Sequence, residues 1–87
     1  MYYVHLSEKA NKFLEKLDTL IRERIKERLK KLEENPVPQD AKFMGRDENN
    51  EKIFRYRIGD FRALYKVKEK DKIVLIAKVD KRPRVYK

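Results

Sequence analysis

Three arginines lie close together in the segment 53–65 and could bind a phosphate group. The segment reads as two runs of β-branched and aromatic residues separated by Gly59-Asp60. A two-residue loop with glycine first favours a β-hairpin with a type II′ turn. In that hairpin Arg57 stands directly opposite Arg62, and Arg55 lies two residues along on the same face. Because like charges facing each other across two strands repel, this face is expected to bind an anion.

The tail Lys81–Lys87 places further basic groups near the hairpin. Pro83 prevents regular strand pairing within it. If the strand before the tail pairs with the second strand of the hairpin, the tail emerges beside the facing arginines. Arg82, Arg84 and Tyr86 would then be within reach of the same anion.

The composition is that of a small, basic domain. The 87 residues are 45% charged and carry a formal net charge of +9. A chain of this length buries only about 60–65% of the surface exposed on unfolding, so its core is small. Residues 1–35 hold 9 basic and 7 acidic side chains, whereas residues 36–87 hold 15 and 8. The excess positive charge therefore belongs to the half with the hairpin and indicates a polyanionic or acidic partner rather than a buried catalytic cavity.

Several kinds of site are excluded or unsupported. The chain has no cysteine, which excludes disulfides, thiolate metal sites and cysteine nucleophiles. The acidic residues Asp40, Asp47 and Glu48 lack metal-ligand spacing, so we expect neither a metal nor a cofactor. The single histidine, His5, has no nucleophilic partner nearby in the sequence. No run approaches the roughly 20 apolar residues that cross a bilayer, and no signal peptide precedes the first strand. We expect a cytoplasmic protein that does not contact a membrane.

A strand and two helices precede the hairpin. The strand is predicted over Tyr2–Leu6. Ser7 follows as the N-cap of a first, short helix. A second, longer helix begins near Asp18-Thr19 and ends at Asn35, because Pro36 follows. Apolar residues recur at helical spacing along both helices; they are Ala10, Phe13, Leu14 and Leu17 in the first, and Ile21, Ile25, Leu29 and Leu32 in the second.

The second helix also carries a basic run that could be mistaken for a nucleic-acid site. Glutamates interrupt the run at positions 23, 27, 33 and 34. Glu/Arg and Glu/Lys pairs at helical spacing are typical of a solvated face. We therefore interpret this surface as solvent-exposed.

The rest of the chain completes a sheet. Residues 36–50 are predicted to be an irregular connection anchored by Phe43 and Met44, and Ile73–Val79 an apolar strand covered on both sides. One hairpin face is apolar and suits helix packing; it holds Phe54, Tyr56, Ile58, Ala63, Tyr65 and Val67. The prediction is a single α+β domain over 1–87, in the order β-α-α-β-β-β. Its two-helix hairpin packs on one face of a small, mainly antiparallel sheet.

The chain resembles a RelE-type toxin of the RelE/ParE superfamily over almost its whole length. The resemblance rests on a K-x-x-G segment at Lys42–Gly45, on the run R-I-G-D-F-R-A-L-Y at Arg57–Tyr65, and on the ending K-R-P-R-V-Y. It implies a toxin that enters the ribosomal A site and cleaves mRNA without a metal. In that reaction the ribose 2′-OH attacks the adjacent phosphate and leaves a cyclic phosphate and a 5′-OH. It also implies a RelB-type antitoxin that wraps the toxin, with operator DNA bound only through the complex.

The same resemblance implies roles for individual residues. Arg55 corresponds to a residue that contacts the scissile phosphate, and Arg62 to one that stabilises the phosphorane. Arg82 corresponds to the general acid, and Tyr86 to an aromatic that orients the nucleotide. Crowded cations and a stacking aromatic suit phosphoryl chemistry on RNA. Further contacts to RNA are expected from the other basic residues nearby: Lys52, Arg57, Lys66, Lys81 and Arg84.

The resemblance fails at the general base, because Ile53 stands where a lysine is expected. Lys52 is adjacent but points to the other face of a regular strand. A bulge could turn Lys52 around, Lys66 or Tyr86 could take the role, or the protein could rely on electrostatics alone. The isoleucine also leaves open a non-catalytic nucleic-acid-binding repressor subunit. A gyrase inhibitor of the ParE branch is a third possibility.

Overall fold

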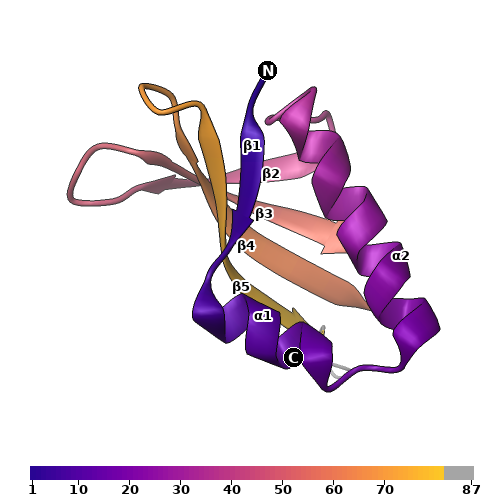
Figure 1. Ribbon diagram of the computed structural model, residues 1–87. Coiled ribbons are helices and arrows are strands. Elements are labelled where there is room, and N and C mark those ends of the chain that lie inside the picture. The colour runs from indigo at the N-terminus through magenta and orange to yellow at the C-terminus, as the bar shows by residue number, and fades with distance from the viewer. Residues whose placement is uncertain (82–87) are drawn as a thin grey trace, which may run out of the picture.

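The computed structural model describes residues 1–81, which form two helices and a five-stranded sheet (Figure 1). The helices are α1 (Glu8–Glu15) and α2 (Thr19–Lys30), the second continuing into a 3₁₀ turn, Lys31–Glu33. The strands are β1 (Tyr3–Leu6), β2 (Ala41–Arg46), β3 (Lys52–Ile58), β4 (Phe61–Lys68) and β5 (Ile73–Lys81).

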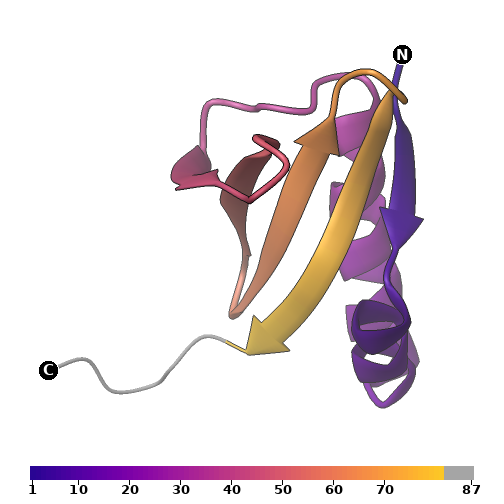
Figure 2. The same ribbon diagram turned by 90° about the vertical axis from the view of Figure 1, so that its left-hand side faces the viewer.

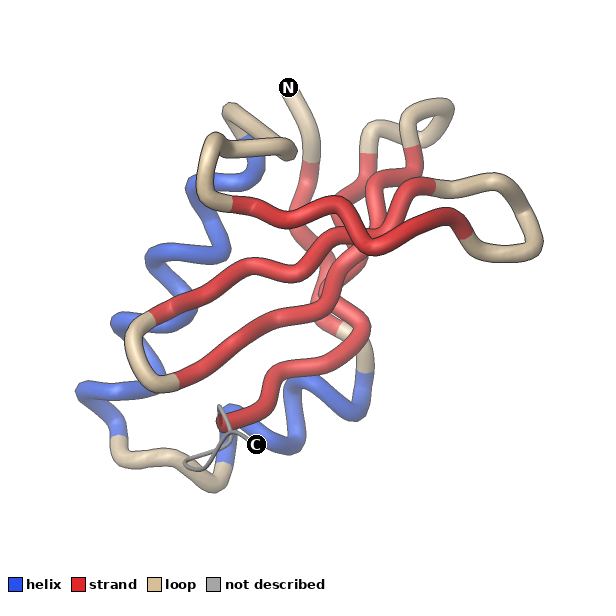
Figure 3. Tube along the Cα trace, turned by 180° about the vertical axis from the view of Figure 1, so that it is seen from behind, coloured by secondary structure: helices blue, strands red, loops and turns tan. Residues whose placement is uncertain are grey.

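The sheet has the order β1-β5-β4-β3-β2. Among the strands of residues 1–81 only the β1–β5 pair is parallel, and it brings the first strand beside the last. The α+β, mainly antiparallel prediction is confirmed. Both helices cover one face of the sheet, as Figure 2 shows. In Figure 3 the opposite face, which we call the open face, is turned toward the viewer and no helix crosses it.

The irregular connection predicted for residues 36–50 is wrong in part, because Ala41–Arg46 forms the edge strand β2. It pairs with β3 through a bulge between Phe43 and Gly45, and Gly45 has φ 132°. The predicted anchors are exposed, Phe43 at 52% and Met44 at 47%. Phe43 nevertheless meets Phe54 edge to face, with ring centroids 5.7 Å apart.

The core lies between the helices and the apolar hairpin face, as predicted. All six apolar hairpin residues named above are buried, together with Ala10 and Leu14 of α1 and Ile25 and Leu29 of α2. Ile21 departs from the expected stripe, being 37% exposed. Burial of this face fixes the hairpin register, since a slip of one residue would turn every arginine inward.

Strand β5 is not covered on both sides, contrary to the prediction. Its side chains alternate between buried and partly exposed, because only one face of the sheet carries helices. A bulge interrupts its pairing with β4, leaving Ala77 without a partner. Ser7 compensates: its hydroxyl donates to the Ala77 carbonyl at 2.8 Å and accepts from the Ala10 amide at 3.0 Å. The N-cap of α1 is thus joined to the bulge.

The charged surface of α2 is exposed as predicted, but its ions are paired differently. Within residues 1–81, α2 takes part in two ion pairs, Arg22–Glu23 at 3.8 Å and Arg28–Asp40 at 3.5 Å, rather than in a ladder of pairs one turn apart. Arg28 also donates to the Tyr56 hydroxyl at 3.1 Å. Neither helix in the described part of the chain has the length and apolar character needed to cross a membrane.

Candidate anion-binding site on the open face

Two rows of side chains run across the open face at the hairpin end of the sheet. In the first row Asp80 of β5, Arg62 of β4 and Arg57 of β3 are successive cross-strand partners. In the second row the partners are Lys78, Leu64, Arg55 and Lys42, from β5 to β2. Directly paired residues share a face and lie about 4.5–5.5 Å apart at Cα. The predicted facing of Arg57 and Arg62 is confirmed.

The hairpin turn supports this arrangement. Gly59 has φ 59°, and Asp60 is absent from the residues with positive φ, which is the sign pattern of a type II′ turn. Glycine adopts this left-handed conformation without steric penalty. A larger residue at position 59 would strain the turn that places Arg57 opposite Arg62.

A shallow hollow lies between the two rows. Its volume is about 220 Å³, and it is lined by Met44, Arg55, Arg62, Ala63, Leu64, Lys78 and Asp80. The bulges of β2 and β5 adjoin it, at Met44 and just before Lys78. Bulges re-aim side chains and recur beside binding sites. Among residues 1–81 the lining combines apolar side chains with four charged groups.

In the described part of the chain, Arg55, Arg57 and Arg62 on the open face are not neutralised by neighbouring carboxylates. Arg55 and Arg62 are half-buried and Arg57 is exposed. Within residues 1–81 none of the three forms an ion pair within 4.0 Å, so Arg57 pairs with neither Asp60 nor Asp80 there. Repulsion between adjacent guanidinium groups is relieved when an anion binds between them.

Lys78 and Asp80 are lining residues that the sequence analysis missed. Lys78 Nζ lies 3.0 Å from Asp80 Oδ2, and both side chains are partly exposed. The signal was present, because two charged residues at positions i and i+2 of an otherwise apolar strand must share a face. The apolar run ending at Val79 concealed it.

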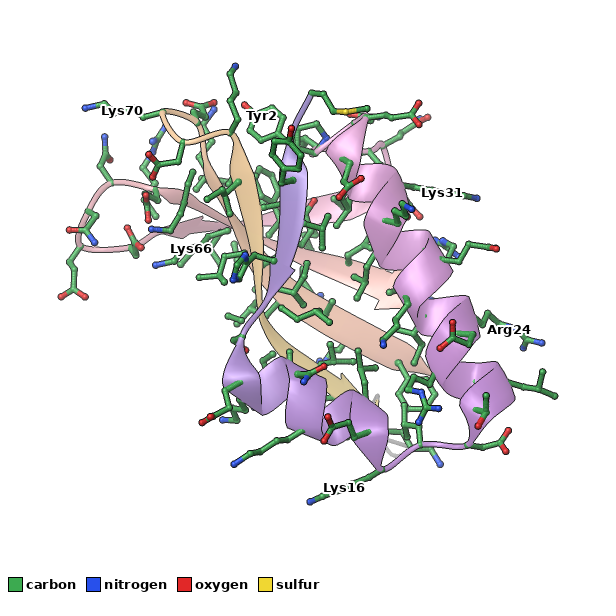
Figure 4. The ribbon with its side chains drawn as sticks, viewed as in Figure 1. Tyr2, Lys16, Arg24, Lys31, Lys66 and Lys70 are labelled. Carbon is green, nitrogen blue, oxygen red and sulfur yellow. The ribbon has the colours of Figure 1, made fainter. Side chains whose placement is uncertain are left out.

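Two lysines proposed as alternative general bases lie elsewhere. Lys52 begins β3 and pairs with Val67, on the face that the helices cover, and β3 has no bulge that would turn it around. Lys66 is on the open face but is engaged: its Nζ lies 2.8 Å from Asp47 and 3.5 Å from Glu51. Figure 4 shows Lys66 beside the β2–β3 loop, on the opposite side of the sheet from Arg24.

The ion pair with Asp47 raises the pKa of Lys66, which keeps this amine protonated. A general base needs a free lone pair at working pH. This placement disfavours Lys66 as the base. Within residues 1–81, no three His, Asp or Glu side chains are grouped in a way that could hold a metal ion.

The titration of Asp47 provides a test of this cluster. Hydrogen bonds from Lys66 and from the Glu51 and Asn49 amides lower the pKa of Asp47 from 3.8 to about 2. Because the folded value is below the unfolded one, this carboxylate stabilises the fold fully above pH 3.8, and the contribution is lost as the pH falls through about 2. An NMR titration of the Asp47 carboxyl carbon should show this low midpoint. In K66M the midpoint should rise, and an unchanged midpoint would contradict the arrangement.

The last described residue, Lys81, is one of the predicted RNA contacts. Lys81 pairs with Phe61, so it belongs to the helix-covered side rather than to the arginine rows. The tail starts one residue beyond Asp80, next to Arg62, as expected from the strand order. The predictions for Arg82, Arg84 and Tyr86 lie outside the described residues.

Comparison with known proteins assigns the chain to a family. A family model described as the ParE toxin of type II toxin-antitoxin system, parDE, matches residues 4–86. "Putative toxin RelE1" of Methanocaldococcus jannaschii is 30% identical over 86 residues, spanning 99% of this chain and 96% of the relative.

Solved structures agree with that assignment. The archaeal RelE-RelB complex from Pyrococcus horikoshii OT3 contains a chain with 31% identity and a TM-score of 0.84, covering 97% of this chain and 98% of that one. The isolated Escherichia coli RelE toxin has 26% identity and a TM-score of 0.76, covering 98% and 88%. The chain therefore belongs to the RelE/ParE superfamily of toxins from toxin–antitoxin systems.

Proposed function

We propose that this toxin is a metal-independent endoribonuclease that cleaves mRNA in the ribosomal A site. The observation that carries the proposal is the pair Arg55 and Arg62, which line one hollow from adjacent strands and have no ion-pair partner within residues 1–81. A phosphate that gains charge as a nucleophile attacks is stabilised by cations fixed in this way. RNA offers the nucleophile itself, the ribose 2′-OH.

In this proposal Arg55 binds the scissile phosphate and Arg62 stabilises the phosphorane. The 2′-oxygen bonds to phosphorus, the bond to the 5′-oxygen breaks, and the products are a cyclic phosphate and a 5′-OH. The tail would supply Arg82 as general acid and Tyr86 as the orienting aromatic, with Arg84 nearby. Arg57, exposed at the rim, would contact the RNA backbone.

A RelB-type antitoxin is the proposed protein partner. Support comes from the P. horikoshii relative, which was solved as a RelE-RelB complex, and from a second complex of this kind, RelBE2 of Mycobacterium tuberculosis. The helices also leave apolar side chains exposed, Leu20 at 75% among them. Contiguous exposed apolar surface is typical of a face that a partner covers. Operator DNA would be bound only through that complex.

Purified toxin added to programmed ribosomes tests the proposal. The toxin is first treated with EDTA to remove any bound metal. We expect it to stop protein synthesis and to cut the message within the A-site codon. The upstream fragment should carry a 2′,3′-cyclic phosphate. Primer extension maps the cut, and addition of the antitoxin should prevent it. Full synthesis with uncut message would contradict the proposal.

The description of the matching family as a ParE toxin favours one second candidate, a gyrase inhibitor. DNA supercoiling by purified gyrase separates the two functions. Inhibited supercoiling with uncut A-site message fits the ParE activity, whereas unaffected supercoiling with cut message fits the nuclease. A non-catalytic repressor subunit, which Ile53 left open, would affect neither assay and would not arrest growth on expression.

A further inference from the structure

We propose that Asp80 is the general base of the cleavage reaction, an inference that rests on the proposed endoribonuclease function. The position where the family resemblance expects a basic residue holds Ile53, which cannot accept a proton. Among the lining residues in the part of the chain that the structure describes, Asp80 supplies the only carboxylate. A carboxylate oxygen has lone pairs that can accept a proton, whereas the guanidinium and ammonium groups of the lining have none.

The position of Asp80 suits proton transfer from a ribose 2′-OH. Asp80 is the direct cross-strand partner of Arg62, and Arg55 lies on β3 in the adjacent row. All three side chains line the same hollow, so a phosphate bound there by the two arginines is near the carboxylate. The 2′-oxygen is separated from its 3′-phosphate by only two ribose carbons and one oxygen. A base for this reaction must accordingly stand next to the phosphate site, as Asp80 does.

Lys78 holds this carboxylate in place. Its Nζ lies 3.0 Å from Asp80 Oδ2, and within residues 1–81 the second carboxylate oxygen has no ion-pair partner, so it can face the substrate. The bulge at Ala77 sets the register that pairs Lys78 with Leu64 and Asp80 with Arg62. Lys78 is thus a positioning residue, and Asp80 is the residue that would touch the substrate.

The proton balance is complete without a metal. The Asp80 carboxylate removes the 2′-OH proton as the 2′-oxygen bonds to phosphorus. The phosphorus–5′-oxygen bond then breaks, and the leaving oxygen gains a proton that comes from water, either directly or through the general acid of the proposed function, which water then reprotonates. The Asp80 carboxyl returns its proton to water after the product leaves.

Cationic side chains surround this carboxylate on the open face. Within residues 1–81 the groups nearest to Asp80 by cross-strand pairing are Lys78 on its own strand, Arg62 on β4, and Arg57 and Arg55 on β3. Farther along the same face lie His5 of β1 and Lys66, which is paired with Asp47 and Glu51. The guanidinium groups keep their charge when Asp80 is replaced, so an Asp80 variant retains the cations that would hold the phosphate.

Single-turnover cleavage of message on programmed ribosomes tests this role, with the wild type, D80N, D80E and D60N compared. We expect D80N to be slower by about 10²–10⁴-fold, the usual contribution of a general base. Its binding to programmed ribosomes should be retained. D80E should keep part of the rate, because it keeps a carboxylate near the same place. D60N, which removes a carboxylate from the nearby hairpin turn, should cleave like the wild type.

Other outcomes overturn the inference. Wild-type rates in D80N would exclude the role, and faster cleavage would mean that Asp80 only repels the phosphate. A slow D80N that also binds programmed ribosomes more weakly or melts at a lower temperature would indicate a structural role. If the wild type leaves the message uncut, both the proposed function and this inference are wrong. If the wild type and D80N cut the message equally fast, only the inference is wrong. Circular dichroism and thermal melting confirm that each variant is folded.

Discussion

Arg62→Ala is expected to slow cleavage of A-site message by at least about 10²–10³-fold, the cost of removing one preorganised group that stabilises developing charge. The guanidinium lies between Arg57 and Asp80 in its row and lines the hollow with Arg55. No other side chain of β4 can replace it, because its neighbour on the same face is Leu64. Single-turnover cleavage on programmed ribosomes is the measurement.

The matched control is Arg24→Ala, which removes an exposed arginine from α2, on the other side of the sheet (Figure 4). That variant should cleave at the wild-type rate and show that the loss is not an effect of net charge. Arg62→Lys should recover part of the rate, since an ammonium keeps the charge but not the two-pronged hydrogen bonding of a guanidinium. Undiminished cleavage by Arg62→Ala and by Arg82→Ala together would mean that the site is misplaced.

The hairpin and its two faces could be predicted because three independent signals agree there. Alternation fixes which side chains share a face, the Gly59-Asp60 turn fixes the register, and burial of Tyr56 and Tyr65 prevents a slip. Each signal is local in sequence. The facing of Arg57 and Arg62 follows from them without knowledge of the rest of the fold.

Strand β2 could not be predicted because its signal is not local. Its residues are mostly exposed or half-buried, and the bulge next to Gly45 breaks the alternation that marks a strand. What holds this segment extended is pairing with the edge of β3. Three-dimensional context of this kind overrides a weak propensity.

The lining of the hollow was only half predictable for the same reason. Lys66 has the spacing of a site residue, but Asp47, 19 positions earlier in the sequence, binds it. Asp80 is the converse case, because the sequence pattern did not mark it as a site residue. It lies beside Arg62 because the bulge at Ala77 sets the register of β5 against β4. Neither an ion pair between distant residues nor a bulge can be read from periodicity. The identity of the base therefore depends on the sheet pairing.

Tyr65→Ala is expected to cost about 3–5 kcal/mol of unfolding free energy, as for other large aromatic residues in cores. Tyr65 has no exposed surface. Its ring stacks on Phe54 with centroids 5.5 Å apart, and its hydroxyl donates to the Pro36 carbonyl at 2.6 Å. Burial raises the pKa of this phenol, so the hydroxyl remains a donor at any ordinary pH. The side chain therefore supports the core and also ties the α2–β2 connection to β4.

Urea unfolding separates these two contributions. Tyr65→Phe keeps the ring and removes the hydroxyl, so it should cost about 1–3 kcal/mol, the penalty of leaving a polar partner without its hydrogen bond. Tyr3→Ala removes a tyrosine that is 66% exposed and should change stability by less than about 0.5 kcal/mol. In a domain of this size each kcal/mol shifts the melting temperature by roughly 4–8 °C, which places Tyr65→Ala at least about 12 °C below the wild type. A loss no greater than that of Tyr3→Ala would contradict the packing of Tyr65 in the core.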